Sequence, residues 1–233
     1  MINFLSILLT VVWMSACTKG VAPKRSLNAE MEKVSYSIGF SIGRSMKQQD
    51  LQLDQEAFIA GLIDARSAAK PVLDEAAQSK IMREFQMSQQ KKAQDKREKD
   101  ASKNGDEGKR YLEANKKKEG IKVTKSGLQY KVIKPGTGAK PKAEDTVVTH
   151  YKGTLIDGTE FDSSYSRNQP ATFPVKGVIK GWTEALQLMP VGSKWQLFIP
   201  SDLAYGERGS GPKIGPNSTL IFEVELLEIK KKG

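Results

Sequence analysis

The hydrophobic periodicity of the chain changes at Gly120, and this change constrains the fold more than any other feature. After Gly120, apolar and polar residues alternate over residues 128–132, 147–151, 195–199 and 220–226, which predicts half-buried β-strands. Between residues 28 and 119, apolar residues instead recur at helical spacing or give way to long polar stretches. The sequence therefore predicts a helical N-terminal half and then a compact domain of antiparallel strands and one helix, an α+β fold.

The composition removes several classes of site. The chain has one cysteine, which excludes an intrachain disulfide and a zinc site built from several thiolates. Its one histidine, His150, excludes a histidine-rich metal site, and its place within an alternating strand favours a surface or packing role. The net charge of +10 permits binding to nucleic acid or to an anionic membrane without establishing either. We expect no metal and no cofactor.

The first segment predicts export. Residues 2–16 carry no charged side chain, and such a stretch is short for a membrane-spanning helix but typical of a signal peptide. Two small residues stand directly before Cys17, which resembles a bacterial lipoprotein signal, in which the cysteine is lipidated. We interpret residues 1–17 as a signal peptide with a lipidated Cys17 and residues 18–27 as a polar tether. An ordinary cleaved signal or an uncleaved anchor is the alternative. The predicted location is the periplasm or outer membrane of a Gram-negative-type bacterium.

Residues 28–73 predict a pair of helices. The first has an apolar face that repeats every four residues: Val34, Ile38, Ile42 and Met46. Beside this face runs a line of small residues, which would let another backbone approach closely: Ser35, Gly39 and Gly43. A second helix is predicted over residues 55–65. Two short helices bury little by themselves, so they pack either on the later domain or on a second copy; we favour a homodimer through residues 28–73.

A long polar helix is predicted over residues 74–119. Asp74 is a suitable N-cap, and the following residues are rich in Glu, Lys, Gln, Arg and Ala, without proline. A helix that is polar on all sides is usually a solvated spacer between domains. The pair Asn104-Gly105 and the nearby Gly108 could bend or interrupt it. The basic residues are mixed with acidic ones and lack aromatic neighbours for base stacking, so we expect no nucleic-acid partner.

Residues 120–233 predict the compact domain. Asp157-Gly158 between two apolar runs is a strong hairpin signal. One short helix is predicted over residues 181–189. The Gly- and Pro-rich loop at residues 201–218 has a length that, in a compact domain, usually indicates function or disorder. The ordered strands predicted on either side favour function.

The sequence lacks the common signatures of nucleophilic and nucleotide chemistry. It contains no nucleophile elbow, phosphate-binding loop, dinucleotide fingerprint or EF-hand loop. Paired carboxylates for glycoside hydrolysis stay open, but nothing singles out a pair. The compact domain instead gathers many of the aromatic residues: Tyr151, Phe161, Phe173, Trp182, Trp195, Tyr205 and Phe222. Core packing explains several of them, and the open question is whether others line a pocket.

Four stretches of this domain carry a specific resemblance. They are VTHYKGTLIDGTEFDSS, PATFPVKGVIKGWTEAL, VGSKWQLFIPSDLAYGERG and IGPNSTLIFEVELLEI. In order and spacing they resemble the FK506-binding (FKBP) domain of peptidyl-prolyl cis-trans isomerases. The helical half is similar to that of the Mip/FkpA group (macrophage infectivity potentiator-like) of exported bacterial isomerases. In that group VSYSIG-type helices dimerise and a long helix carries the FKBP domain. The resemblance covers nearly all of the chain after the signal.

The resemblance implies a half-open antiparallel sheet curved around one short helix, with an apolar pocket between them. It implies catalytic positions at Tyr151, Asp162, Phe173, Trp182 and Tyr205. It implies substrate-binding positions at Phe161, Arg167, Val178, Ile179, Ile214 and Phe222. In this scheme Trp182 forms the floor beneath a proline ring, while the Tyr205 hydroxyl and the Ile179 N–H donate to substrate carbonyls.

Two positions depart from the family pattern. Many relatives have an aromatic residue where this chain has Ala171, and an apolar one where it has Lys213. The resemblance places both at the pocket rim, so we expect them to affect substrate preference and inhibitor affinity more than activity itself.

The predicted function is peptidyl-prolyl cis-trans isomerisation that assists the folding of exported or surface proteins. The pocket would desolvate and twist the Xaa-Pro amide without a covalent intermediate. The alternative is a holdase chaperone, in which two domains on long arms clasp clients and isomerisation is secondary. Predicted partners are proline-containing polypeptides, a second copy of the chain, FK506-type macrolides as inhibitors, and a membrane through the N-terminal lipid.

Overall fold

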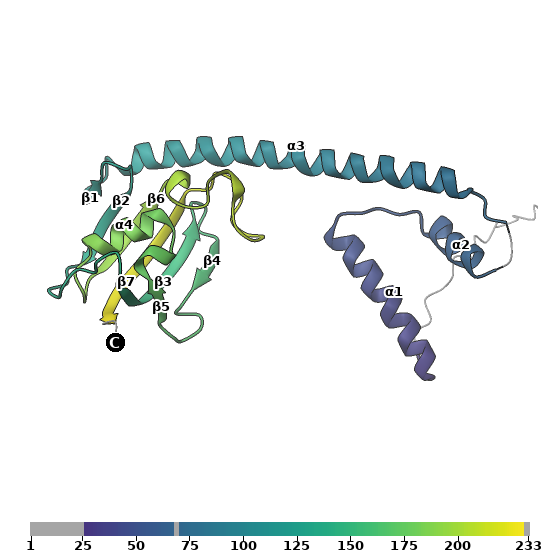
Figure 1. The fold of residues 1–233 in the computed structure, drawn as a ribbon, viewed down its shortest axis with the longest axis horizontal. Helices are drawn as coiled ribbons and strands as arrows, with labels where there is room; N and C mark the ends of the chain where they lie inside the picture. The colour runs from purple at the N-terminus through teal and green to yellow at the C-terminus, as the bar shows by residue number, and fades with distance from the viewer. Residues whose placement is uncertain (1–25, 68–69, 231–233) are drawn as a thin grey trace, which may run out of the picture. The chain divides into compact units, whose positions relative to one another are not determined.

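The computed structural model describes residues 26–67 and 70–230 (Figure 1). The predicted signal peptide, with Cys17, lies outside these residues. The chain divides between Asp74 and Glu75 into two compact units.

The N-terminal unit contains two helices, α1 (Glu30–Gln48) and α2 (Gln55–Arg66). Glu32 begins α1 by accepting hydrogen bonds from the backbone N–H groups of residues 28 and 29. Asp54 caps α2, because its side chain accepts from the Ala57 N–H at 2.8 Å. The helix predicted over residues 55–65 is confirmed. Neither helix contains a buried residue. Every helix in the described part of the chain is too short or too polar to cross a membrane.

The second unit begins with the long helix α3 (Glu75–Asn115). Its 41 residues correspond to about 60 Å at 1.5 Å per residue. The helix runs without interruption through Asn104, Gly105 and Gly108, so the break that these residues suggested does not occur. The idea of a helix solvated on all sides is also wrong for its second half, where Gly108 and Asn115 are buried.

The second half of α3 packs against the sheet domain, which we define as residues 120–230. The Tyr111 ring lies against Phe198, with the ring centroids 6.2 Å apart. The Asn115 side-chain amide donates to Gln129 Oε1 at 3.0 Å, and the Gln129 amide donates to the Leu112 carbonyl at 2.9 Å. These contacts satisfy two buried polar side chains and join the end of α3 to the second strand of the sheet.

The sheet domain is built on one seven-stranded sheet in which neighbouring strands pair antiparallel. The strands are β1 (Ile121–Val123), β2 (Gln129–Lys134), β3 (Thr146–Leu155), β4 (Glu160–Ser163), β5 (Ala171–Pro174), β6 (Lys194–Ile199) and β7 (Leu220–Lys230). Their order is β1-β2-β6-β7-β3-β4, and β5 also pairs with β3. The predicted α+β fold class is confirmed.

The turn between β3 and β4 follows the predicted hairpin. Gly158 adopts a φ of +87°, which only glycine accepts without strain. The Leu155 N–H donates to the Thr159 carbonyl at 2.9 Å, and the Asp157 carboxylate accepts from the Thr159 N–H at 2.9 Å. The turn therefore brings β4 back beside β3.

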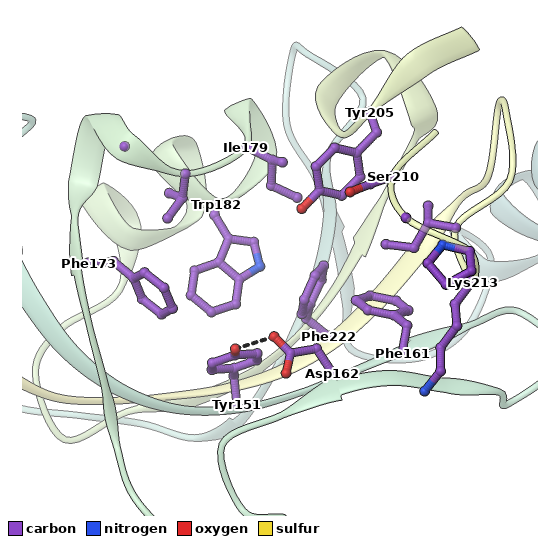
Figure 2. Close-up of a pocket in the computed structure, with 15 residues that line it drawn as sticks. Tyr151, Phe161, Asp162, Phe173, Ile179, Trp182, Tyr205, Ser210, Lys213 and Phe222 are labelled. Carbon is purple, nitrogen blue, oxygen red and sulfur yellow. Dashed lines mark hydrogen bonds between the residues drawn. The ribbon is translucent and has the colours of Figure 1, made fainter. Parts of the chain in front are cut away.

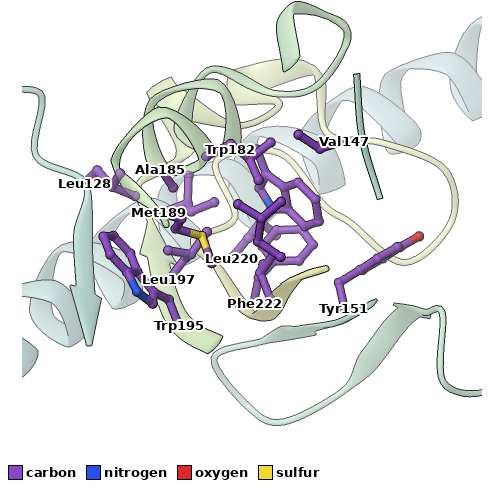
Figure 3. Packing of buried hydrophobic residues seen from close by; sticks show 14 of the residues in the cluster. Leu128, Val147, Tyr151, Trp182, Ala185, Met189, Trp195, Leu197, Leu220 and Phe222 are labelled. Atoms are coloured by element: carbon purple, nitrogen blue, oxygen red, sulfur yellow. The ribbon is translucent and has the colours of Figure 1, made fainter. Parts of the chain in front are cut away.

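The hydrophobic core lies between the sheet and the helix α4 (Lys180–Leu188) (Figure 3). Trp182, Ala185 and Leu186 form the buried face of α4, close to the helix predicted over residues 181–189. The sheet contributes alternate residues of its central strands, because successive side chains of a strand point to opposite faces. They include Val147, Tyr151, Trp195, Leu197, Ile199, Leu220, Phe222, Val224 and Leu226.

Gly105 and Gly108 provide a matched pair of substitutions on α3. A Cβ built at Gly105 meets nothing closer than the Asn217 Cβ at 3.8 Å, so Gly105→Ala is expected to stabilise by about 0.5–1 kcal/mol through helix propensity. A Cβ at Gly108 would overlap the Thr219 hydroxyl and lie 3.3 Å from its Cβ. Overpacking of this kind costs about 1–3 kcal/mol, so Gly108→Ala is expected to destabilise by about 1 kcal/mol net.

The measurement is urea unfolding followed by tryptophan fluorescence, since Trp182 and Trp195 are both in the core. Equal effects of the two alanines on the unfolding midpoint would contradict the close contact between α3 and Thr219.

Candidate active site

One pocket of about 790 Å³ opens between α4, the sheet and the loop that follows β6 (Figure 2). We call residues 201–218 the pocket loop. The wall of the pocket is mainly aromatic and aliphatic. It is lined by Tyr151, Phe161, Asp162, Phe173, Gly177, Val178, Ile179, Trp182, Tyr205, Ser210, Gly211, Pro212, Lys213, Ile214 and Phe222.

The strand register brings the aromatic wall together. Gly153 on β3 pairs with Phe222 on β7, and it also pairs with Asp162 on β4, next to Phe161. A Cβ at Gly153 would lie 2.6 Å from Phe161 Cζ and 2.8 Å from Phe222 Cε1. The missing side chain lets the two rings meet edge to face, with their centroids 5.4 Å apart.

Trp182, in the first turn of α4, is the ring that the other aromatic residues share. Its indole packs edge to face against Tyr151, Phe173 and Phe222, with centroid distances of 5.3, 5.7 and 5.2 Å. Such arrangements are favourable by about 0.5–1.5 kcal/mol each beyond the area they bury. Because each neighbour fixes the indole from a different side, Trp182 forms a rigid base for the pocket.

A small polar network occupies one side of the pocket. The Tyr151 hydroxyl donates to one oxygen of Asp162, and Arg167 donates to the other oxygen. Arg167 also donates to the Tyr151 hydroxyl at 2.9 Å. The carboxylate is therefore paired and hydrogen-bonded on both oxygens, which is the condition for keeping a charge at the edge of an apolar site.

The network shifts the pKa values of its members. Burial alone would raise the pKa of Asp162, but the hydrogen bonds from Tyr151 and Arg167 outweigh burial and hold this pKa below its ordinary value. Burial, with the neighbouring Asp162 carboxylate, raises the pKa of Tyr151. At neutral pH the group is an ionised carboxylate held by a neutral phenol and a cationic guanidinium.

Several hydrogen-bond donors of the pocket are left without an acceptor among the described residues. Besides the buried Trp182 indole N–H, they include the Tyr205 hydroxyl and the backbone N–H of Ile179. The Tyr205 side chain is 40% exposed, and its hydroxyl is directed into the pocket beside Ile179 (Figure 2). The Tyr205 hydroxyl and the Ile179 N–H are available to donate to the carbonyl groups of a bound peptide.

Ten of the eleven residues that the sequence analysis assigned to the site line this one pocket. The eleventh, Arg167, contacts the pocket through Asp162 and Tyr151. The assignment left out Gly177, and three pocket-loop residues that line the wall: Ser210, Gly211 and Pro212. The loop was expected to be functional from its length and composition, but neither property indicates which of its residues face inward.

The two departures from the family pattern have different surroundings. Lys213 lines the pocket, and its ammonium group donates to the Glu160 carbonyl at 3.0 Å. Ala171 is half-buried and packs against the core cluster without lining the pocket.

A metal site and a catalytic histidine, both considered from the sequence, find no support among the described residues. No group of three or more His, Cys, Asp or Glu side chains in this part of the chain is placed to hold a metal ion. His150 hydrogen-bonds through Nδ1 with Ser164 Oγ at 2.9 Å and stacks on Tyr165, so its contacts are those of a packing residue.

Comparisons with known proteins agree with this geometry. Residues 137–227 match the family model of the FKBP-type peptidyl-prolyl cis-trans isomerase, and residues 31–132 match that of the domain amino-terminal to it. "Outer membrane protein MIP" of Legionella longbeachae is 48% identical over 206 residues, which are 88% of each chain. The isomerase FkpA of Aeromonas hydrophila is 49% identical over 90% of this chain and 80% of its own.

The chain belongs to the FKBP-type peptidyl-prolyl cis-trans isomerases. A solved structure agrees: FkpA from Escherichia coli superposes with a TM-score of 0.68 at 44% identity, over 88% of this chain and 99% of that one. The family resemblance and the enzyme class inferred from the sequence are confirmed. The pocket of this FKBP-type isomerase therefore becomes the candidate site for its reaction.

The lowered pKa of Asp162 predicts a pH dependence of stability. Because the pKa is lower in the folded isomerase than in the unfolded chain, the unfolded state binds more protons between the two values. The stabilisation from this carboxylate is therefore fully present above the ordinary aspartate pKa of about 3.9 and is lost as the pH falls through the folded value. Acidification from about pH 6 to pH 3 should thus destabilise the parent more than Asp162→Asn.

Urea midpoints measured across this range test the dependence. Tyr151→Phe removes one of the two donors and should give an intermediate slope. Parallel pH profiles for the parent and Asp162→Asn would show that the network does not stabilise the carboxylate.

Proposed function

We propose that the isomerase acts on Xaa-Pro bonds of unfolded or surface-exposed chains outside the cytoplasm, and that the pocket around Trp182 is where it does so. The observation that carries this proposal is the pocket itself. It offers rigid aromatic walls, free hydrogen-bond donors that include the Tyr205 hydroxyl and the Ile179 N–H, and one charge network at its edge. Nothing in this arrangement requires a nucleophile or a proton transfer.

The physical barrier to the reaction is amide resonance. Rotation about the C–N bond costs about 18–20 kcal/mol because resonance gives that bond double-bond character. The planar form places partial negative charge on oxygen, where water stabilises it. A pocket that removes this water disfavours the planar form and favours a twisted amide, whose oxygen carries less charge. Each 1.36 kcal/mol of preference for the twisted state accelerates the reaction tenfold.

The proposed roles follow from the positions of the side chains. A proline ring would sit on Trp182, between Tyr151 and Phe173 on one side and Phe222 on the other. The Ile179 N–H and the Tyr205 hydroxyl would donate to the backbone carbonyls that flank the proline and would hold the chain while the amide rotates. These donors replace the water that a bound chain loses, so binding need not leave carbonyls unsatisfied.

The Asp162 network would act on the orientation of Tyr151. Its carboxylate fixes the phenol by a hydrogen bond, and Arg167 donates to both the carboxylate and the phenol. The negative charge is neutralised within the network, so the remaining wall of the pocket stays apolar. Removing Asp162 would leave Tyr151 held only by the hydrogen bond from Arg167 and would admit water to the site.

Two tyrosines give a matched test of the pocket. Tyr205→Phe removes only the free pocket hydroxyl, and the loss of one hydrogen bond to substrate should lower kcat/KM about three- to tenfold. Tyr165→Phe removes a hydroxyl outside the pocket, next to His150, and should leave the rate unchanged. The measurement is the rate of cis-to-trans isomerisation of a short Xaa-Pro peptide. Without a catalyst this isomerisation takes tens to hundreds of seconds.

Either of two results would count against the proposal. A folded parent chain that gives no acceleration would leave the pocket as a peptide-binding site alone. Equal rates for Tyr205→Phe and the parent would remove the Tyr205 hydroxyl from the mechanism.

We also propose that residues 28–73 form a homodimer. The apolar side chains of α1 are largely exposed within the single chain, among them Ile38 (58%) and Phe40 (59%). A Cβ built at Gly39 or Gly43 meets nothing within 4 Å, so the small-residue line is open to a second backbone. A continuous exposed apolar face usually marks an interface with another protein.

An acidic substitution on either side of α1 tests the dimer. Ile38→Glu would bury a charge in the interface and should convert the chain to a monomer, as measured by light scattering. Ser37→Glu places the same side chain in the polar sector of α1, beside Lys33 and Arg44, and should leave the dimer intact. A parent chain that is monomeric at micromolar concentration would end this proposal.

The remaining parts of the proposal concern location and ligands. A lipid on Cys17 would hold the isomerase at a bacterial membrane, and the name of the Legionella relative places that protein in the outer membrane. FK506-type macrolides are proposed as inhibitors because their binding site in the family corresponds to the pocket around Trp182. Lys213 at the pocket wall is expected to affect their affinity.

A further inference from the structure

The pocket loop has little regular structure of its own to hold it in place. Its described elements are two short 3-10 turns, at residues 201–203 and 206–208, and one bridge between Ser210 and Ile214. Yet the loop supplies Tyr205 and Ile214 to the pocket wall. Ordering a residue costs about 1–2 kcal/mol in backbone entropy, so a loop of this length needs external contacts.

Those contacts come from α3. The Arg97 guanidinium donates to the carbonyls of Glu207 and Arg208 at 3.0 and 3.2 Å. These two residues belong to the 3-10 turn that immediately follows Tyr205. Arg97 therefore holds the backbone within three residues of a pocket hydroxyl.

A second set of contacts lies farther toward the C-terminal end of α3. The Asn104 amide donates to the Pro216 carbonyl at 2.8 Å, and the Asn217 amide donates to the Ala101 carbonyl of the helix at 3.3 Å. Asn217 adopts a φ of +56°, and its backbone N–H donates to the Gly206 carbonyl at 2.8 Å. Asn217 thus links α3 directly to the residue next to Tyr205.

The anchors share one face of α3. Arg97, Ala101, Asn104 and Gly108 are separated by four, three and four residues, which places them along a single stripe of the helix. This stripe faces the pocket loop and the start of β7, where Gly108 packs on Thr219. The Asn104 amide also lies against Gly215, since a Cβ built there would be 2.9 Å from its nitrogen.

We propose that this face of α3 positions the pocket loop, and that Arg97 and Asn104 are positioning residues for the isomerase reaction. They do not reach the substrate pocket, and they act through the loop that carries Tyr205 and Ile214. Without them the loop samples more conformations, and the Tyr205 hydroxyl spends less time where it can donate to the substrate. The rate effect rests on the function proposed above, whereas the ordering of the loop does not.

The test uses the full chain with three variants that each remove one anchor. Arg97→Ala removes the contacts to residues 207 and 208, and Asn104→Ala removes those to residues 216 and 218. Asn217→Gly removes the bond to Ala101 while a glycine keeps the positive φ without strain. The controls are Lys96→Ala and Ser102→Ala, at exposed positions of α3 for which the structure gives no contact to the sheet domain.

Amide hydrogen exchange over residues 205–217 reports on the loop independently of activity. Each anchor variant should exchange about three- to tenfold faster than the parent in this segment, while the controls match the parent. The cis-to-trans rate of an Xaa-Pro peptide should fall about two- to fivefold in the same variants. The urea midpoint should stay close to that of the controls, and Arg97→Lys, which keeps a donor, should recover part of the loss.

A double variant separates positioning from a general loss of stability. In a Tyr205→Phe background the hydroxyl is already absent, so Asn104→Ala should lower the rate by less than it does in the parent. Equal effects in the two backgrounds, or unchanged rates despite faster exchange, would overturn the positioning role. Unchanged exchange in all three anchor variants would overturn the contact itself. A parent chain without isomerase activity would refute the proposed function, and exchange would still decide whether α3 orders the loop.

Discussion

The pairing of β3 with β7 is the interaction on which the site depends. It joins ten residue pairs, from Thr146 with Lys230 to Leu155 with Leu220. Because alternate residues share a face, this register puts Tyr151 and Gly153 beside Val224 and Phe222 on the side that α4 covers. A slip of one residue would turn every one of these side chains to the other face and leave Trp182 without its neighbours.

The same register separates the polar chemistry of the pocket from the apolar part. Asp162 comes from β4, at the edge of the sheet, where its carboxylate can meet Arg167 at the solvent boundary. The buried rings of Tyr151, Phe222 and Trp182 come from β3, β7 and α4. The charge is therefore satisfied where water is near, and the proposed seat for proline lies where water is excluded. An isomerase that works by desolvation requires this separation, because an uncompensated charge near Trp182 would hold water in the pocket.

The sequence predicted those parts of the fold that have local causes. Alternation indicated β2, β3, β6 and β7, and Asp157-Gly158 indicated the hairpin, since both signals depend on neighbouring residues alone. The strands β1 and β5, of three and four residues, were not predicted because so short a segment carries no periodicity.

The site itself could not be predicted from spacing. Tyr151, Asp162 and Trp182 lie on three different elements, and only the resemblance to a known family suggested that they meet. The sequence indicates that Asn104 and Gly108 weaken a helix, but it does not indicate that they contact the sheet domain. Their partners, Pro216 and Thr219, are more than a hundred residues away in the sequence. No local pattern can reveal a contact of that range.

These long-range contacts make α3 and the pocket loop depend on each other. The sequence of α3 around Asn104 and Gly108 has low helix propensity and no apolar stripe, so its helical state relies on the sheet domain. The pocket loop in turn has little regular structure, and hydrogen bonds join it to Arg97 and Asn104 of α3. Such coupling is reciprocal: the contacts between α3 and the pocket loop stabilise the ordered state of each by the same free energy. Loss of order in α3 would therefore change the position of the Tyr205 hydroxyl, even though every residue that lines the pocket is unchanged.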